Sequence, residues 1–224
     1  MDFQVDVYTN VHKGQRCKFS SISMKAGNID CADQNAMDKL QEELESFREH
    51  LRLHAAHEER FIHPLLSERI PGGSSKLNED HRIMHQQLDD LSADFKGIKT
   101  KFVDFEKQQE LLLEFYRAWN RFMVFYFAHI DYEEESIQSS LWKLCTSEEL
   151  IGAFKQILAN QTPEELMSDL EMMLPALSLS ETVALFKAGR ANLPPQTSEA
   201  FLKIAERVLN SSDWTALKSK LMLS

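Results

Sequence analysis

Histidine and glutamate side chains recur at helical spacing in this sequence, at positions that interrupt otherwise apolar patterns. His54 and Glu58 stand four residues apart, and so do His129 and Glu133. Residues four apart on a helix lie roughly 40° from each other around its axis, so each pair projects from one face. A buried histidine with a hydrogen-bonded glutamate explains one such pair. Several pairs that meet in one core would instead form a metal site, because imidazole and carboxylate are common metal ligands.

Further histidines occupy similar positions elsewhere in the chain. His81 and His85 form an HxxxH pair one turn apart, a common two-imidazole metal platform. His12 interrupts a weaker apolar pattern near the N-terminus. The candidate ligand set is His12, His54, Glu58, His81, His85, His129 and Glu133. Five imidazoles and two carboxylates are too many for one ion and suit two metal ions with bridging carboxylates.

Four predicted helices position these side chains. The apolar patterns predict helices over residues 4–25, 33–70, 74–97 and 104–145. Helices joined by short loops pack up-down-up-down, which brings their apolar stripes together in one core. We therefore expect an all-α fold, with a four-helix bundle in residues 1–145 and a small helical extension in residues 146–224. Helix starts in the extension are predicted at Ser147, Thr162 and Ser180.

The phase of each apolar stripe separates inward from outward side chains. The stripe of the second predicted helix is Phe47, Leu51, Phe61 and Leu65. His57 and His63 fall off this stripe and are predicted to face solvent. In the fourth helix the stripe continues through Glu133, with Glu134 as the alternative. The predicted walls of the ligand pocket include the aromatic rings of Phe125 and Tyr8. Polar groups near the ligands are predicted at Gln15, Arg16 and Tyr132.

Composition and charge narrow the class of protein. The formal net charge of -10 and the lack of a basic cluster argue against nucleic-acid binding. The most apolar run, Phe115–Ile130, contains arginines and is too short to cross a membrane. The three cysteines have no metal-ligand spacing, which indicates reduced thiols. Because the N-terminus has no signal-peptide features, we expect a soluble cytoplasmic protein.

The sequence resembles the hemerythrin and HHE cation-binding family over about residues 4–145. The motifs that carry the resemblance are DVYTNVH (His12), HAAHE (His54, Glu58), HRIMH (His81, His85) and HIDYE (His129, Glu133). The resemblance implies two iron ions joined by an oxo or hydroxo group. It further implies that one iron is bound by His81, His85 and His129, the other by His12 and His54, with Glu58 and Glu133 bridging.

One departure from the family pattern bears on activity. Oxygen-carrying hemerythrins place an Asp five residues after the last His, whereas here Glu133 stands four residues after His129. That spacing is similar to the family's iron-sensing and di-iron repair branches. Manganese and zinc also suit nitrogen and carboxylate ligands.

Three functions fit this ligand set, and the sequence does not decide whether the protein is an enzyme. The leading hypothesis is a protein that binds or senses dioxygen or a related small ligand. One alternative is a stress-response protein or enzyme that acts on peroxide or nitric oxide, or that supplies iron for repair. The other is an interaction module that senses iron or oxygen. The extension contains no histidine and is predicted to contact a protein partner.

Overall fold

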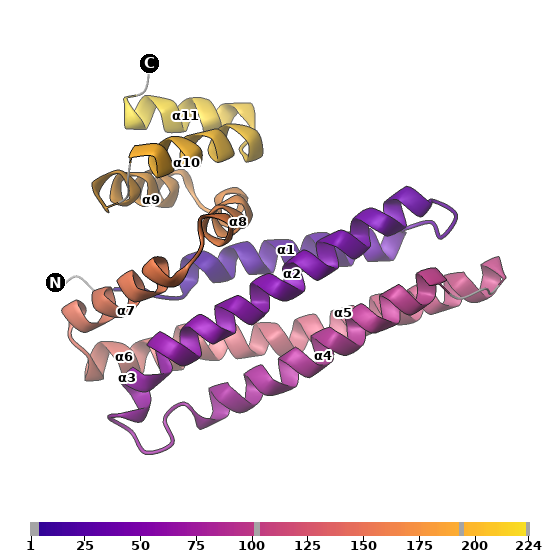
Figure 1. Cartoon of the computed structure of the whole chain (residues 1–224), viewed down its shortest axis with the longest axis horizontal. Coiled ribbons are helices and arrows are strands. Elements are labelled where there is room, and N and C mark those ends of the chain that lie inside the picture. The colour runs from indigo at the N-terminus through magenta and orange to yellow at the C-terminus, as the bar shows by residue number, and fades with distance from the viewer. Residues whose placement is uncertain (1–4, 101–103, 193–194, 223–224) are drawn as a thin grey trace. The chain divides into compact units, whose positions relative to one another are not determined.

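The computed structural model describes residues 5–100, 104–192 and 195–222, and the elements formed by these residues are all helices (Figure 1). The predicted all-α class is therefore confirmed. Two compact units are present. The first comprises residues up to Tyr8 and Lys18–Ile157, and the second comprises Thr9–Cys17 and the chain from Leu158 onward. In the described ranges, no helix is long and apolar enough to span a membrane.

Thirteen helical segments follow one another in these described ranges. They are α1 (Thr9–Asn28), α2 (Gln34–Phe61), α3 (His63–Ser67), α4 (Ser75–Thr100), α5 (Phe105–Tyr132), the π-helical η1 (Glu133–Ile137), α6 (Gln138–Leu144), α7 (Ser147–Asn160), α8 (Pro163–Met173), the 3₁₀ turn η2 (Leu174–Ala176), α9 (Leu179–Asn192), α10 (Pro195–Val208) and α11 (Ser211–Leu221). Aspartates cap two of the long helices, because the Asp33 and Asp104 side chains accept backbone hydrogen bonds from Ala36 and Lys107.

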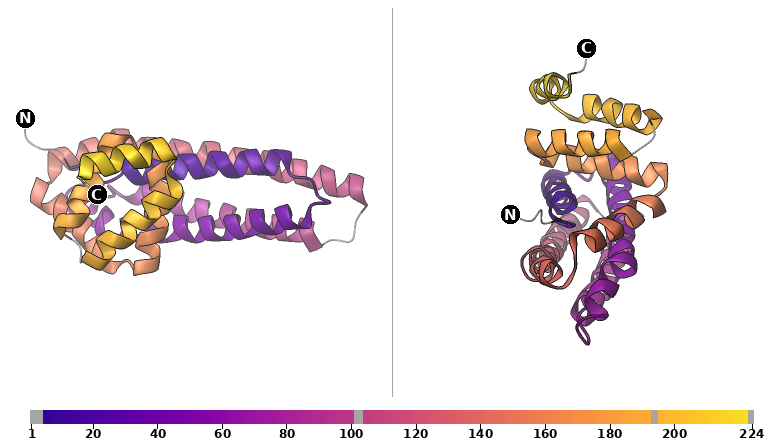
Figure 2. Two further views of the ribbon diagram at one scale, coloured as in Figure 1. Left: turned by 90° about the horizontal axis from the view of Figure 1, so that it is seen from above. Right: turned by 90° about the vertical axis from the view of Figure 1, so that its left-hand side faces the viewer.

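The long helices α2, α4 and α5 form most of the first unit and run alongside one another (Figures 1 and 2). Their apolar stripes face inward, as the periodicity predicted. Leu77, Leu88 and Phe95 of α4 are buried, and so are Phe115 and Trp119 of α5. Burial of these stripes supplies most of the hydrophobic stabilisation of this unit.

The second predicted helix is interrupted, and its prediction as one helix over residues 33–70 was wrong. α2 ends at Phe61, and α3 starts at His63 after Ile62. Pro64 explains the break. It has no amide hydrogen to donate, and in a continuous helix its ring would collide with the carbonyl group of Arg60.

This break changes which side chains point inward. Ile62 and Leu66 are buried, at 2% and 1% exposure, whereas the predicted stripe residues Phe61 and Leu65 are only half-buried. The break also brings His63 into the interior, where it is 2% exposed. The prediction that His63 faces solvent was therefore wrong.

The first predicted helix begins later than expected, at Thr9, because side chains of α6 hold the segment before it. The Val7 amide donates to Gln138 Oε1 at 2.9 Å. Gln138 Nε2 and Trp142 Nε1 both donate to the Val5 carbonyl oxygen, at 3.1 and 2.8 Å. These bonds satisfy backbone groups that a helix would otherwise pair. They also fix Tyr8, the residue before α1.

The second unit contains α8–α11, the orange-to-yellow helices of Figure 2, around its own apolar core. A capping box at Thr162 starts α8 as predicted, since Thr162 and Glu165 exchange side-chain-to-backbone hydrogen bonds. Helix α9 starts at Leu179, before the predicted Ser180, because Ser178 rather than Ser180 accepts from the Glu181 amide. Gly14 contributes through close packing, since a Cβ atom there would lie 3.0 Å from the Met173 Cα atom.

Phe19 packs the part of α1 from Lys18 onward into the core of the first unit. Its side chain is fully buried, and its backbone carbonyl accepts a hydrogen bond from Trp119 Nε1 at 3.3 Å. Its ring contacts those of Phe47, Trp119, Phe122, Tyr126 and Phe127. This packing compensates for the weak helix propensity of the surrounding serines.

We predict that Phe19→Ala lowers the free energy of unfolding of the first unit by about 3–5 kcal/mol, because it removes a large buried ring and leaves a cavity. Met24→Ala, a substitution on the same helix at a side chain that is 67% exposed, should change it by less than about 0.5 kcal/mol. Urea unfolding followed by tryptophan fluorescence measures both. Equal effects of the two substitutions would contradict the packing role of Phe19.

Candidate metal centre

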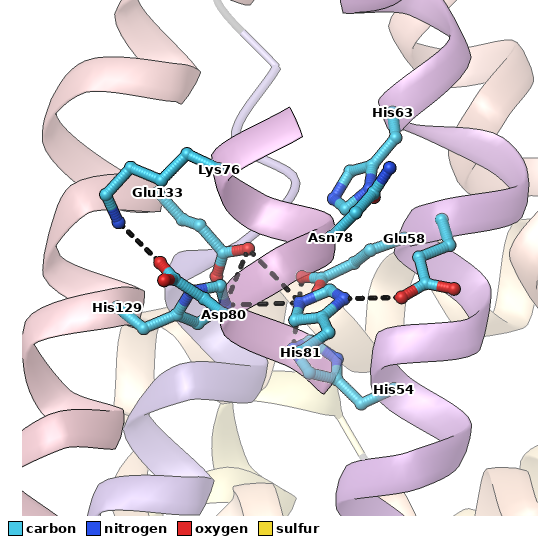
Figure 3. Close-up of polar contacts among 10 residues, drawn as sticks. His54, Glu58, His63, Lys76, Asn78, Asp80, His81, His129 and Glu133 are labelled. Atoms are coloured by element: carbon cyan, nitrogen blue, oxygen red, sulfur yellow. Dashed lines mark hydrogen bonds and ion pairs between the residues drawn. The ribbon is translucent and has the colours of Figure 1, made fainter. Parts of the chain in front are cut away.

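Three helical segments and the end of a fourth bring four of the predicted ligands together in the first unit. Glu58 comes from α2, His81 from α4, His129 from the end of α5 and Glu133 from the start of η1. One ligand atom from each of the four lies within 4.8 Å of the others (Figure 3). All four side chains are at most 3% exposed. This is a buried group of two imidazoles and two carboxylates.

The nitrogens and oxygens of this group face one another. His129 Nε2 lies 3.1 Å from Glu133 Oε1, and His81 Nε2 lies 3.4 Å from Glu58 Oε2. The two Nε2 atoms are 3.2 Å apart. Two ligands bound to one ion at about 2.0–2.1 Å and roughly at right or tetrahedral angles are about 2.8–3.4 Å apart. The observed separation of the two nitrogens fits that range.

Glu58 also faces a third histidine. Its Oε1 atom lies 3.1 Å from Nε2 of His54, one turn earlier on α2, while its Oε2 atom faces His81. His54 is half-buried, and its ring stacks on that of His50 at 6.3 Å. The two oxygens of one carboxylate thus point toward different imidazoles.

Two acidic side chains outside the group contact the Nδ1 atoms of its imidazoles, the nitrogens that point away from the group. His81 Nδ1 donates to Glu59 Oε1 at 2.9 Å, and His129 Nδ1 lies 3.3 Å from Asp80 Oδ2. Burial raises the pKa of Asp80, but hydrogen bonds from Lys76 and His129 outweigh this effect and hold the pKa below its usual value. Hydrogen at Nδ1 leaves the Nε2 lone pairs directed inward. Such outer carboxylates orient histidines that bind metals.

Charge inside the group requires a cation. Burial lowers the pKa of His81, but hydrogen bonding and attraction to Glu58, together with the charge of Glu133, outweigh burial and raise the pKa to about 9. Burial, and then the charges of Glu133 and Glu58, raise the pKa of Tyr8 well above its usual value. Two desolvated carboxylates thus attract positive charge, and a metal ion would supply it. The residues fit a metal with nitrogen and oxygen ligands.

A local change of helix type places Glu133. The predicted fourth helix is regular to Tyr132 and continues as π-helix over Glu133–Ile137, where the Gln138 amide donates to the Glu133 carbonyl. This extra residue in the turn lets Glu133 face the imidazoles while Ile137 and Gln138 stay buried. Glu133 is fully buried and Glu134 half-buried. A π turn in an α-helix is frequently found at functional sites.

Besides His54, two predicted ligands lie outside the group of four, for different reasons. The His85 ring lies 6.5 Å from that of His81, and burial lowers its pKa. Its Nε2 atom is buried and has no hydrogen-bond partner among the described residues. His12 is fully buried on α1 but belongs to the second unit. Metal binding by these two residues, as by the rest of the predicted set, stays a prediction.

Several residues of the site were not found from the sequence. Glu59 and Asp80 follow Glu58 and precede His81 directly, so a search for acids next to ligands would have identified them. For His63 the signal was Pro64, because a proline inside a helical pattern predicts a break that changes which side chains face inward. Of the predicted pocket walls, Tyr8 and Gln15 are buried, and Arg16, Phe125 and Tyr132 are half-buried.

The fold and the site together define an all-helical protein with a buried His/Glu centre suited to metal. Comparison with protein families agrees, because the hemerythrin HHE cation binding domain matches residues 5–140. The chain belongs to this family. No curated protein and no solved structure matches the chain.

The structure predicts which acid of the Glu133–Glu134 pair binds metal. Glu133→Ala should remove a buried carboxylate that faces His129 and His81 and should lower the metal content of the purified protein. Glu134→Ala changes a side chain outside the group of four and should leave the metal content unchanged. Elemental analysis of both variants decides between them. Loss of metal only in Glu134→Ala would place the ligand one residue later.

Proposed function

We propose that this protein binds two metal ions, with iron the leading candidate, in an up-down-up-down four-helix bundle. The proposed ligands are His12, His54, Glu58, His81, His85, His129 and Glu133. Its proposed role is to bind or sense dioxygen or a related small molecule in the cytoplasm. Manganese and zinc are the alternative metals. The bundle boundary at residue 145 and a protein partner for the extension stay predictions.

One observation carries this proposal, the position of Glu58 between two imidazoles. A carboxylate that served only to orient one histidine would contact a single imidazole ring, with one or both of its oxygens. Here one oxygen lies 3.1 Å from His54 and the other 3.4 Å from His81. Glu133 lies on the far side of the same group, at 3.1 Å from His129. Paired carboxylates among imidazoles suit two ions better than one.

The chain's own residues would bind and orient the metal and keep bulk solvent away from it. Iron, when bound, would supply reversible coordination of a small ligand and electron transfer to it. Glu59 and Asp80 fix the rings of His81 and His129, so that the same nitrogen of each faces inward. Ile62, Leu66 and Ile137 form an apolar cluster with Tyr8, and this cluster would limit the access of bulk solvent.

A second candidate function is favoured by Tyr8, namely a stress-response role toward peroxide or nitric oxide. The phenol is 1% exposed, and Glu58 and Glu133 help to raise its pKa. It therefore keeps its proton at neutral pH. A buried hydroxyl beside the centre can donate that proton, and proton donation favours reduction or release of a bound oxygen species over its stable binding.

The ultraviolet–visible spectrum of the reduced, iron-loaded protein before and after exposure to air distinguishes the two functions. We predict a charge-transfer band that forms in air and disappears reversibly when oxygen is removed. A transient band that persists longer in Tyr8→Phe would favour the peroxide function, because this substitution removes only the hydroxyl group. An iron-loaded protein whose spectrum does not respond to air would contradict dioxygen binding.

A further inference from the structure

His63 is a buried histidine outside the proposed ligand set, and its protonation pattern follows from its neighbours. Its Nδ1 atom lies 2.6 Å from Oδ1 of Asn78 on α4. An amide oxygen only accepts hydrogen bonds, so Nδ1 carries the hydrogen. The remaining nitrogen, Nε2, therefore presents a lone pair.

This Nε2 atom is buried and has no hydrogen-bond partner in the part of the chain that the structure describes. Leaving a buried polar atom unsatisfied costs about 1–3 kcal/mol, and native proteins seldom do so. The cost is avoidable here, because a leucine or phenylalanine could fill the same interior position. A nitrogen in this place indicates a partner that comes from outside the chain.

His63 lies next to the candidate metal centre, so a partner of its Nε2 atom would lie at that centre. The His63 ring stacks on the His81 ring with 5.3 Å between centroids and 23° between planes. Figure 3 shows it beside Asn78, close to Glu58 and His81. In an unbroken helix His63 would lie roughly 140° around the axis from Glu58. The break at Ile62 is what turns it toward the group.

The surroundings of Nε2 also select the kind of partner. Nε2 offers a lone pair and no hydrogen, so this lone pair is repelled by an anion that has no hydrogen to offer. It is stabilised by a molecule that brings a hydrogen-bond donor, such as one with an O–H group.

We propose that His63 accepts a hydrogen bond from a small O–H-bearing molecule at the metal centre, such as water or a hydroperoxide, and thereby disfavours aprotic anions of similar size. This inference rests on the proposed function, because it needs a metal-loaded centre that admits a small ligand. Asn78 is the positioning residue, since it holds the hydrogen on the other nitrogen of the ring.

The first measurement is the metal content of the full-length wild type, His63→Gln, His63→Phe and the control His57→Gln. His57 is a half-buried histidine of α2 outside the proposed ligand set. Equal metal content in all four supports a role for His63 in ligand recognition. A metal-free wild type would overturn the proposed function and this inference with it. A loaded wild type with metal-free His63 variants would overturn this inference alone, because His63 would then be a metal ligand.

The second measurement is the dissociation constant of azide, titrated into the iron-loaded proteins and followed by absorbance. Azide is a small anion without a hydrogen. His63→Phe removes the acceptor lone pair and should bind azide about 2- to 12-fold more tightly than the wild type, the range for one hydrogen-bonding group. His57→Gln should be unchanged. Unchanged or weaker azide binding in His63→Phe would overturn the proposal.

The third measurement tests the protonation pattern without a redox-active metal. In zinc-loaded protein labelled with ¹⁵N-histidine, the resonances that disappear in His63→Gln belong to His63. They should show hydrogen at Nδ1 and none at Nε2, and Asn78→Ala should weaken this preference. Hydrogen at Nε2 in the wild type would overturn the assignment of His63 as an acceptor.

Discussion

Two carboxylates in the interior of the first unit, Glu58 and Glu133, constrain the structure around them. Removing a carboxylate from water costs several kcal/mol even after relaxation, so it stays ionised only beside positive charge. Three imidazoles surround the pair, and each can offer a lone pair or, when protonated, a charge. The raised pKa of His81, about 9, reflects this demand. A metal ion meets the same demand without protonating the histidine that must bind it.

The departures from regular helix occur where this centre is built. The break at Ile62 keeps Ile62 and Leu66 in the core and brings His63 inward. The π turn that starts at Glu133 lets that carboxylate face the imidazoles while Gln138 stays buried. Gln138 in turn holds the segment that carries Tyr8. Local irregularities of this kind weaken a helix, and they persist because the surrounding packing and the site require them.

Much of the fold could be predicted from the sequence, because apolar residues repeat at helical spacing over long stretches. The stripes of α4 and α5 are clear for this reason, and they identified His81, His129 and Glu133. The break before Pro64 and the π turn could not be predicted from periodicity, since each shifts the phase of the stripe by an amount that only tertiary packing decides. His63 was misplaced as a direct result. The outer carboxylates Glu59 and Asp80 were missed because helix exteriors are rich in acids, and only geometry separates these two from the rest.

The number of metal ions per chain tests the central claim most directly. That claim is that the two buried carboxylates and the histidines around them together bind two metal ions. Protein produced with ample iron and purified under nitrogen should contain close to two metal ions per chain by elemental analysis. A folded protein that binds only one ion at saturation, or that binds no metal under these conditions, would contradict the account.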